Sequence, residues 1–195
     1  MTGIEQLAEN VNKLKYPKTI VDKGWLYGVW YCGTSFQKSI YYGQYPLTFV
    51  KRIEAMFPSS KLLHLCCGRC KIQGAVNVDF HDLPEVDVVA NVESLPDNLK
   101  QQEFDVVLID PPYSEQDADR YKVPRLINSR KVMEQAKLAL KEGGHLLWLD
   151  EKYPVYKRND WKLVGLISII TGAERRCRVL SIFQKPSQLT EKELS

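Results

Sequence analysis

The residues best suited to chemistry stand where a predicted buried strand stops. Residues 106–109 are apolar and largely β-branched, the pattern of a strand covered on both faces in a parallel sheet. Asp110, Pro111, Pro112 and Tyr113 follow at once. Two prolines prevent further pairing and fix φ, so we expect the Asp110 carboxylate and its neighbouring carbonyls to be held rigidly. Ligands of open α/β sheets bind at this carboxyl end, where a carboxylate, a fixed carbonyl and an aromatic ring would share one small space.

This tetrapeptide resembles the Asp-Pro-Pro-Tyr signature of the amino-methyltransferases, S-adenosylmethionine (SAM) enzymes that methylate exocyclic amines of bases. The resemblance implies that Asp110, Pro111, Pro112 and Tyr113 form the catalytic element. Asp110 and the Pro111 carbonyl would accept both N–H bonds of the amine and expose its lone pair. Tyr113 would stack on the target ring, a contact worth roughly 1–3 kcal/mol. The alternative is an ordinary turn, because Asp-Pro often opens one.

The composition is that of a globular protein. The chain has 195 residues, of which 44% are hydrophobic, enough for one core, so we expect a single domain over residues 1–195. No apolar run reaches the roughly 18 residues of a membrane span and no signal peptide opens the chain, which favours a cytoplasmic protein. The net charge of +3 permits nucleic-acid binding without requiring it. Five cysteines without an export signal favour reduced thiols over disulfides.

The elements before the motif predict a SAM site. Residues 61–65 read as the first strand, residues 75–78 as the second and residues 86–90 as the third. Asp79 ends the second strand, where a Rossmann-like site accepts hydrogen bonds from ribose hydroxyls. By resemblance, the 44–46 loop and the helix over residues 47–57 hold the methionine part of SAM. The predicted cofactor-binding residues are Tyr42, Gln44, Pro46, Cys66, Cys67, Gly68, Asp79, Phe80, Asn91, Val92 and Asp110.

The first crossover departs from the family pattern. Only about eleven residues separate Gly68 from Asp79, too few for a full helix and a strand, so the connection must shrink to a turn or be irregular. His64 and the Cys67-x-x-Cys70 pair suggest a metal, but no second such pair exists. We therefore expect no metal, and small buried thiols in the place of glycine.

Aromatic residues and glycines alternate over residues 25–45, after a predicted amphipathic helix in residues 1–15 that we expect to pack on the domain. This composition favours an irregular lid that stacks on a base and closes over the cofactor; an aromatic cap over the sheet is the alternative. Trp30 and Tyr41 are predicted to touch the substrate.

The second half of the chain supplies the acceptor side. We predict a polar loop over residues 114–130, a helix over residues 131–140 ended by Gly143-Gly144, a strand over residues 145–149 and a closing antiparallel pair over residues 161–170 and 175–183. Arg175, Arg176 and Arg178 form the candidate nucleic-acid patch, although a guarded edge strand explains them equally. Residues 186–195 are expected to be a flexible tail.

Together these elements predict a Rossmann-like class I methyltransferase fold, mostly parallel, ending in an antiparallel hairpin. By resemblance, the nearest group is the small adenine-specific DNA methylases, with SAM as cofactor and adenine N6 in DNA as acceptor. No segment is long enough for a target-recognition region, so a partner protein would supply recognition. An RNA base amine is the first alternative, and a non-catalytic SAM- or nucleic-acid-binding subunit is the second.

Overall fold

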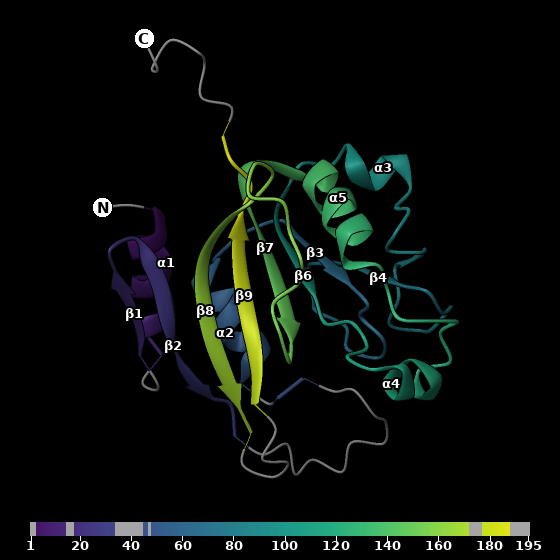
Figure 1. Cartoon of the computed structure of the whole chain (residues 1–195), viewed down its shortest axis with the longest axis horizontal. Helices are drawn as coiled ribbons and strands as arrows, with labels where there is room; N and C mark the ends of the chain where they lie inside the picture. The colour runs from purple at the N-terminus through teal and green to yellow at the C-terminus, as the bar shows by residue number, and fades with distance from the viewer. Residues whose placement is uncertain (1–2, 15–17, 34–44, 47, 172–176, 188–195) are drawn as a thin grey trace.

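The computed structural model describes residues 3–14, 18–33, 45–46, 48–171 and 177–187. Within them lies a nine-stranded sheet in the order β1-β2-β8-β9-β7-β6-β3-β4-β5 (Figure 1). The strands are β1 (Thr19–Asp22), β2 (Trp25–Tyr31), β3 (Leu62–Leu65), β4 (Val76–Asp79), β5 (Val88–Val89), β6 (Phe104–Ile109), β7 (Leu140–Asp150), β8 (Lys162–Ile170) and β9 (Cys177–Gln184).

The strand order is that of a Rossmann-like sheet. Counted from β3, the parallel strands β5-β4-β3-β6-β7 stand in the order 3-2-1-4-5. β9 then runs antiparallel to both β7 and β8, which makes β8 and β9 the closing hairpin. The predicted fold, mostly parallel with an antiparallel hairpin at its end, is confirmed.

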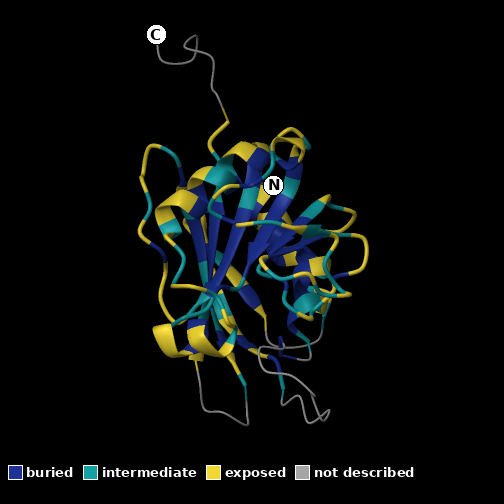
Figure 2. Ribbon diagram, turned by 90° about the vertical axis from the view of Figure 1, so that its right-hand side faces the viewer, coloured by how far each residue is buried: buried dark blue, intermediate teal, exposed yellow. Residues whose placement is uncertain are grey.

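Helices cover the two faces of this sheet unequally. α1 (Gly3–Asn12) and α2 (Phe49–Met56) lie behind it in Figure 1, where Phe49 and Ile53 share a core with Leu108 and Leu147. α5 (Ser129–Ala139) lies in front of it, and with α3 (Asp97–Lys100) it covers the part of the second core around Val107. The strands between these layers are the most buried part of the chain (Figure 2).

The prediction of an irregular lid is wrong for residues 25–31, which form the regular strand β2. Leu26 and Trp30 point into the core, while Trp25, Tyr27, Val29 and Tyr31 are exposed on the other face. This strict alternation is the period of a strand, and it outweighs the interspersed glycines. β2 pairs in parallel with β8, far away in sequence. The rest of the predicted lid, residues 34–44, lies outside the described residues.

Two further elements differ from the prediction. α5 ends at Ala139, and Gly143 and Gly144 lie inside β7 rather than capping the helix. A Cβ on Gly144 would approach the Lys141 carbonyl oxygen to 2.9 Å, so the glycine permits a close passage of backbone. The predicted 114–130 loop contains a short helix, α4 (Glu115–Arg120), capped by the Ser114 side chain.

In the ranges described, no helix is long and apolar enough to cross a membrane. Residues 188–195, most of the predicted tail, lie outside the described residues.

Candidate active site

The carboxyl end of β6 presents Asp110 beside two partners. The Tyr113 hydroxyl donates a hydrogen bond to Asp110 Oδ1. Arg178 Nη1 lies 3.5 Å from the Tyr113 hydroxyl oxygen and 4.0 Å from Asp110 Oδ2. The Asp110 and Arg178 side chains are only 14% and 11% exposed. Since β9 runs antiparallel, its first residues lie at the edge where the parallel strands end, which brings Arg178 to Asp110.

Burial dominates the electrostatics of this cluster. It raises the pKa of Asp110 to about 6, although the Arg178 charge and the Tyr113 hydrogen bond favour the anion. The pKa of Tyr113 is raised well above its usual value, by burial first and by the Asp110 charge second. The Tyr113 hydroxyl therefore stays protonated and remains a donor, while Asp110 titrates close to neutrality.

The loop after β3 meets the end of β4 through Asp79. Gly68 N–H donates to Asp79 Oδ2 at 2.8 Å, and His81 N–H donates to Oδ1 at 3.0 Å. Gly68 has a φ of +52°, a backbone conformation that favours glycine, and a Cβ there would meet nothing within 4 Å. The loop thus turns sharply beside open space, with a carboxylate directly beneath it.

The Cys66 thiol links this loop to Asp110. Burial raises the pKa of Cys66 well above its usual value, and the charges of Asp79 and Asp110 raise it further. The strand registers give the same placement: Leu65 stands opposite both Val78 and Ile109, so Asp79 and Asp110 each follow a partner of the same β3 residue. The ends of β3, β4 and β6, predicted separately from the sequence, converge in a single site.

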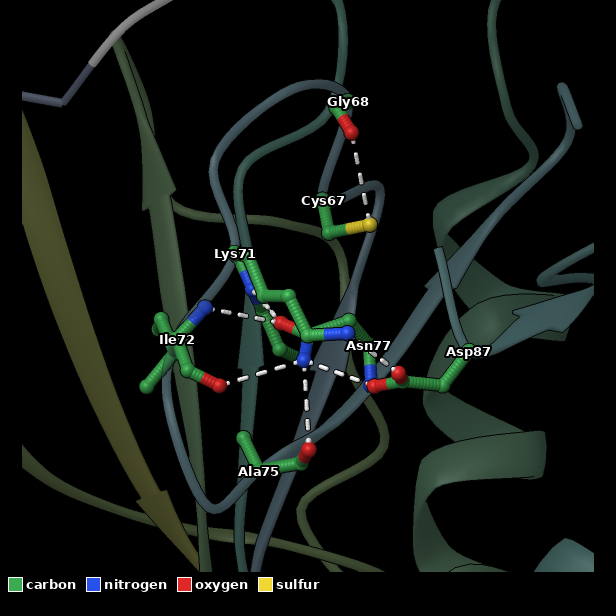
Figure 3. Close-up of polar contacts among 8 residues, drawn as sticks. Cys67, Gly68, Lys71, Ile72, Ala75, Asn77 and Asp87 are labelled. Atoms are coloured by element: carbon green, nitrogen blue, oxygen red, sulfur yellow. Dashed lines mark hydrogen bonds and ion pairs between the residues drawn. The ribbon is translucent and has the colours of Figure 1, made fainter. Parts of the chain in front are cut away.

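Turns replace the first crossover helix, and the Asn77 side chain holds them in place (Figure 3). Asn77 Nδ2 donates to the carbonyl oxygens of Ile72 and Ala75, both at 3.1 Å, and to Asp87 Oδ2 at 2.8 Å. Asp87 also accepts from Asn77 N–H and pairs with Lys71 at 2.7 Å. Figure 3 shows the Asn77 amide at the centre of these contacts. The Asn77 side-chain amide thus holds this helix-free connection between β3 and β4 in place.

The Asn77 side-chain amide also sets the orientation and the tautomer of the buried His64 ring. Since Nδ2 faces three acceptors, Asn77 Oδ1 is the acceptor for Ile72 N–H at 2.9 Å and for His64 Nδ1 at 3.1 Å. Burial lowers the pKa of His64 to about 4, so the ring is neutral at pH 7 and carries its proton on Nδ1. The Tyr45 hydroxyl, 3.0 Å from Nε2, is then the donor. The hydrogen bonds from Tyr45 to His64 and from His64 to Asn77 connect the segment before α2 to the turns between β3 and β4.

The remaining predicted cofactor residues differ in their burial and in their hydrogen bonds. Asn91 Oδ1 accepts from Glu93 N–H at 2.9 Å, which is also how an ordinary turn is made. Val92 is buried, whereas Phe80 beside Asp79 is 47% exposed. Pro46 is buried. Tyr42 and Gln44 lie outside the described residues.

The predicted substrate contact of Trp30 is wrong, and Arg178 lies in a different setting from the predicted patch. Trp30 is fully buried, and its indole N–H donates to Thr19 Oγ1 at 2.9 Å, so it is a core residue. Arg178 lies against Asp110 and Tyr113 rather than in an exposed patch. Tyr41, Arg175 and Arg176 lie outside the described residues. The contact of Arg178 with Asp110 was not predicted, because it depends on the register of β9.

The cysteines of the loop are free thiols. No group of three His, Cys, Asp or Glu side chains in the described ranges is arranged to hold a metal ion.

No protein-family model matches the sequence, and no curated protein is significantly similar to it. Among solved structures, the chain is similar to the 1,6-didemethyltoxoflavin-N1-methyltransferase of Burkholderia thailandensis, with 1,6-didemethyltoxoflavin and S-adenosylhomocysteine bound (TM-score 0.48, 13% identity, 66% of this chain and 72% of that one). It is also similar to the N-methyltransferase NodS of Bradyrhizobium japonicum WM9, bound to S-adenosylhomocysteine (TM-score 0.45, 9% identity, 66% of this chain and 79% of that one).

Proposed function

We propose that this protein is a SAM-dependent methyltransferase that methylates an amine nitrogen. The observation that carries the proposal is the convergence of Asp110, Asp79 and the Gly68 loop at one edge of a Rossmann-like sheet. A ligand with a diol and a reactive group fits this arrangement, since ligands bind where such strands end.

The residues present fit SAM. A carboxylate offers about four lone-pair sites. Asp79 uses one on each oxygen for a backbone N–H, which leaves acceptor capacity for two ribose hydroxyls. The open space beside Gly68 lets backbone approach the cofactor. Asn91, Val92 and Phe80 would border the adenine. When bound, SAM supplies an electrophilic methyl group.

Asp110 and Pro111 would orient the acceptor. With a pKa of about 6, Asp110 is mostly ionised at pH 7 and can accept an N–H bond from the amine, while the Pro111 carbonyl accepts the other. Two such bonds draw the nitrogen lone pair out of conjugation and direct it to the methyl group. The proton released on transfer can pass to Asp110. Tyr113 must first release Asp110 before its ring can stack on the acceptor.

We infer an exocyclic amine of a nucleobase as acceptor, with adenine N6 in DNA as the lead and an RNA base amine as the alternative. The support is the Asp110-Pro111-Pro112-Tyr113 element, which joins two acceptors to an aromatic ring. An extruded base fits such a slot, because its amine and its π-face must be held together. A recognition partner would supply sequence selectivity.

Transfer of labelled methyl from SAM to DNA, RNA, protein and small-molecule fractions tests this function. We expect label in nuclease-sensitive DNA, and its loss in Asp110→Ala with SAM binding retained. Asp119→Asn, which removes an exposed carboxylate on α4, is the matched control and should transfer normally. Label confined to RNA would change the acceptor alone. Equal transfer by Asp110→Ala and the parent protein would refute the role of Asp110.

Calorimetric titration with SAM tests the cofactor site separately. Asp79→Ala should weaken binding by roughly 1.5–3 kcal/mol, the range for hydrogen bonds to a charged group. Unchanged affinity would show that the ribose is held elsewhere.

A further inference from the structure

The strongest feature unrelated to the site is an exposed apolar face on β1, β2 and β8. The side chains are Ile20 (50% exposed), Trp25 (45%), Tyr27 (44%), Val29 (48%), Tyr31 (57%) and Ile170 (36%). The registers place five of them in adjoining cross-strand rows, and Trp25 stands opposite Asp22. The rows are Ile20–Tyr27–Leu166, Val29–Ser168–Val179 and Tyr31–Ile170–Cys177, and the first row ends where Ser181 is fully buried. We call this surface the β2 face.

The β2 face is the uncovered end of the sheet. In Figure 1, α5 lies in front of β6 and β7, and α1 and α2 lie behind the sheet, whereas no described helix lies in front of β8 and β2. The connection from β7 to β8, residues 151–161, contains no α-helix. A connection of this kind between parallel strands usually packs a helix on the sheet. Tyr156 and Trp161 of this connection pack against Phe183, but the side chains named above on β1, β2 and the end of β8 remain exposed.

The size of the β2 face matches one side of a stable protein interface. At roughly 200 Å² for a fully exposed large side chain, the exposed fractions of these six residues amount to about 550 Å² of largely apolar surface. A standard interface buries about 800 Å² per partner, of which about 56–65% is apolar. The β2 face alone therefore supplies the apolar share of such an interface, at the upper limit of what single proteins expose.

The absence of charged side chains from the three rows of the β2 face indicates which kind of partner it fits. None of the residues in the three rows is charged; the charges at the edge are Asp22, the cross-strand partner of Trp25, and Lys23 after it. Nucleic acid would require a cationic surface. A second identical surface meets an uncharged one without repulsion, and two sheet faces pack readily about 10 Å apart. Two-fold pairing uses the same patch on both subunits and so buries both copies at once.

We propose that the β2 face is the interface of a two-fold dimer of this chain. Val29 lies in its middle row, and Trp25 and Tyr31 lie towards its two ends. Arg178, which lies beside Asp110, alternates along β9 with Val179 and Cys177 of this face and therefore points to the other side of the sheet, so each copy keeps its own site.

Sedimentation equilibrium across the micromolar range tests the proposal. We expect a mass twice the 22.5 kDa of one chain. Val29→Lys puts an unpaired charge in the interface and should raise the dissociation constant by more than roughly 100-fold. Leu138→Lys, at a 57% exposed apolar position on α5, is the matched control and should remain dimeric. A monomeric parent protein, or a Val29→Lys dimer of unchanged affinity, would overturn the proposal.

The parent protein offers a second measurement that needs no variant. Of its four tryptophans, Trp25 is 45% exposed, while Trp30, Trp148 and Trp161 are at most 3% exposed. Acrylamide should therefore quench mainly Trp25, and quenching should fall as the protein is concentrated and the dimer forms. Quenching independent of concentration in a protein of dimeric mass would place the interface elsewhere. A monomer that sediments with phosphatidylcholine vesicles would assign the face to lipid and also overturn the proposal.

Discussion

Replacing Asp110 with asparagine should stabilise the protein while it abolishes transfer. Asparagine has the shape of a protonated aspartic acid, so the variant reports on the charge alone. The Tyr113 hydroxyl can still donate to the Oδ1 atom of the new residue, and the 14% exposed site needs no repacking.

The magnitude follows from the pKa. Burial raises the pKa of Asp110 from 3.8 to about 6, the net result after the attraction of Arg178 and the hydrogen bond from Tyr113. At 1.36 kcal/mol per pH unit, this shift lowers the free energy of unfolding by about 3 kcal/mol once Asp110 is ionised in both the folded and the unfolded state. Because the folded protein holds this proton more tightly than the unfolded chain, stability falls as pH rises from about 4 to 6. Asp110→Asn should escape that loss.

Urea unfolding at pH 7.5 and pH 4 measures the effect. We expect Asp110→Asn to exceed the parent protein by up to about 3 kcal/mol at pH 7.5, and the two to agree at pH 4. Asp119→Asn, at an exposed position, should match the parent at both pH values. Two results would refute the conclusion that ionised, buried Asp110 destabilises the folded protein: an Asp110→Asn variant no more stable than the parent at pH 7.5, or one with the same gain in the free energy of unfolding at both pH values.

Three further predictions follow from the site and the fold. If ionised Asp110 is required, kcat/KM should rise about tenfold per pH unit up to pH 6 and then level off; a flat profile between pH 5 and 7 would contradict this. Asn77→Ala should lower the free energy of unfolding by roughly 2–4 kcal/mol, because Ile72 and His64 lose buried hydrogen-bond partners. The exposed Asn98→Ala control should leave the free energy of unfolding unchanged. Equal unfolding midpoints for the two variants would disprove the role of the Asn77 hydrogen bonds. Gly165→Ala would bring a Cβ within 2.6 Å of the Leu26 carbonyl oxygen and should destabilise the protein by at least about 1–3 kcal/mol, measured by thermal melting. Gly3→Ala, where a Cβ meets nothing within 4 Å, is the control. An unchanged melting temperature for Gly165→Ala would mean that β2 and β8 can move apart without loss of stability.

Local patterns were sufficient to predict much of the fold and the core of the site. The apolar run before Asp110 and the acidic end of β4 each carry their signal within a few residues. The strand order then follows from general rules for parallel sheets, and it brings Asp79 and Asp110 to one edge.

The features that the sequence analysis missed around the site involve partners that are distant in sequence. β2 was predicted as a lid because its aromatics and glycines were weighed by composition, while the decisive fact is its pairing with β8. Arg178 reaches Asp110 because β9 lies antiparallel beside β7, which no local pattern encodes. Asn77 replaces a helix by contacts with Ile72 and Asp87 that only the folded chain brings together.

If the proposed cofactor binds as we infer, the thiols of the 66–70 loop lie beside a methylating sulfonium. Burial raises the pKa of Cys67 to about 12, with Asp79 adding to it, and the pKa of Cys70 to about 11, with Asp110 adding to it. Cys66 is raised in the same direction. Only a thiolate attacks an electrophile readily, so at neutral pH these sulfurs are inert. The two carboxylates that would serve the donor and the acceptor thus also suppress self-alkylation, and a loop rich in nucleophilic atoms can border an alkylating agent without consuming it.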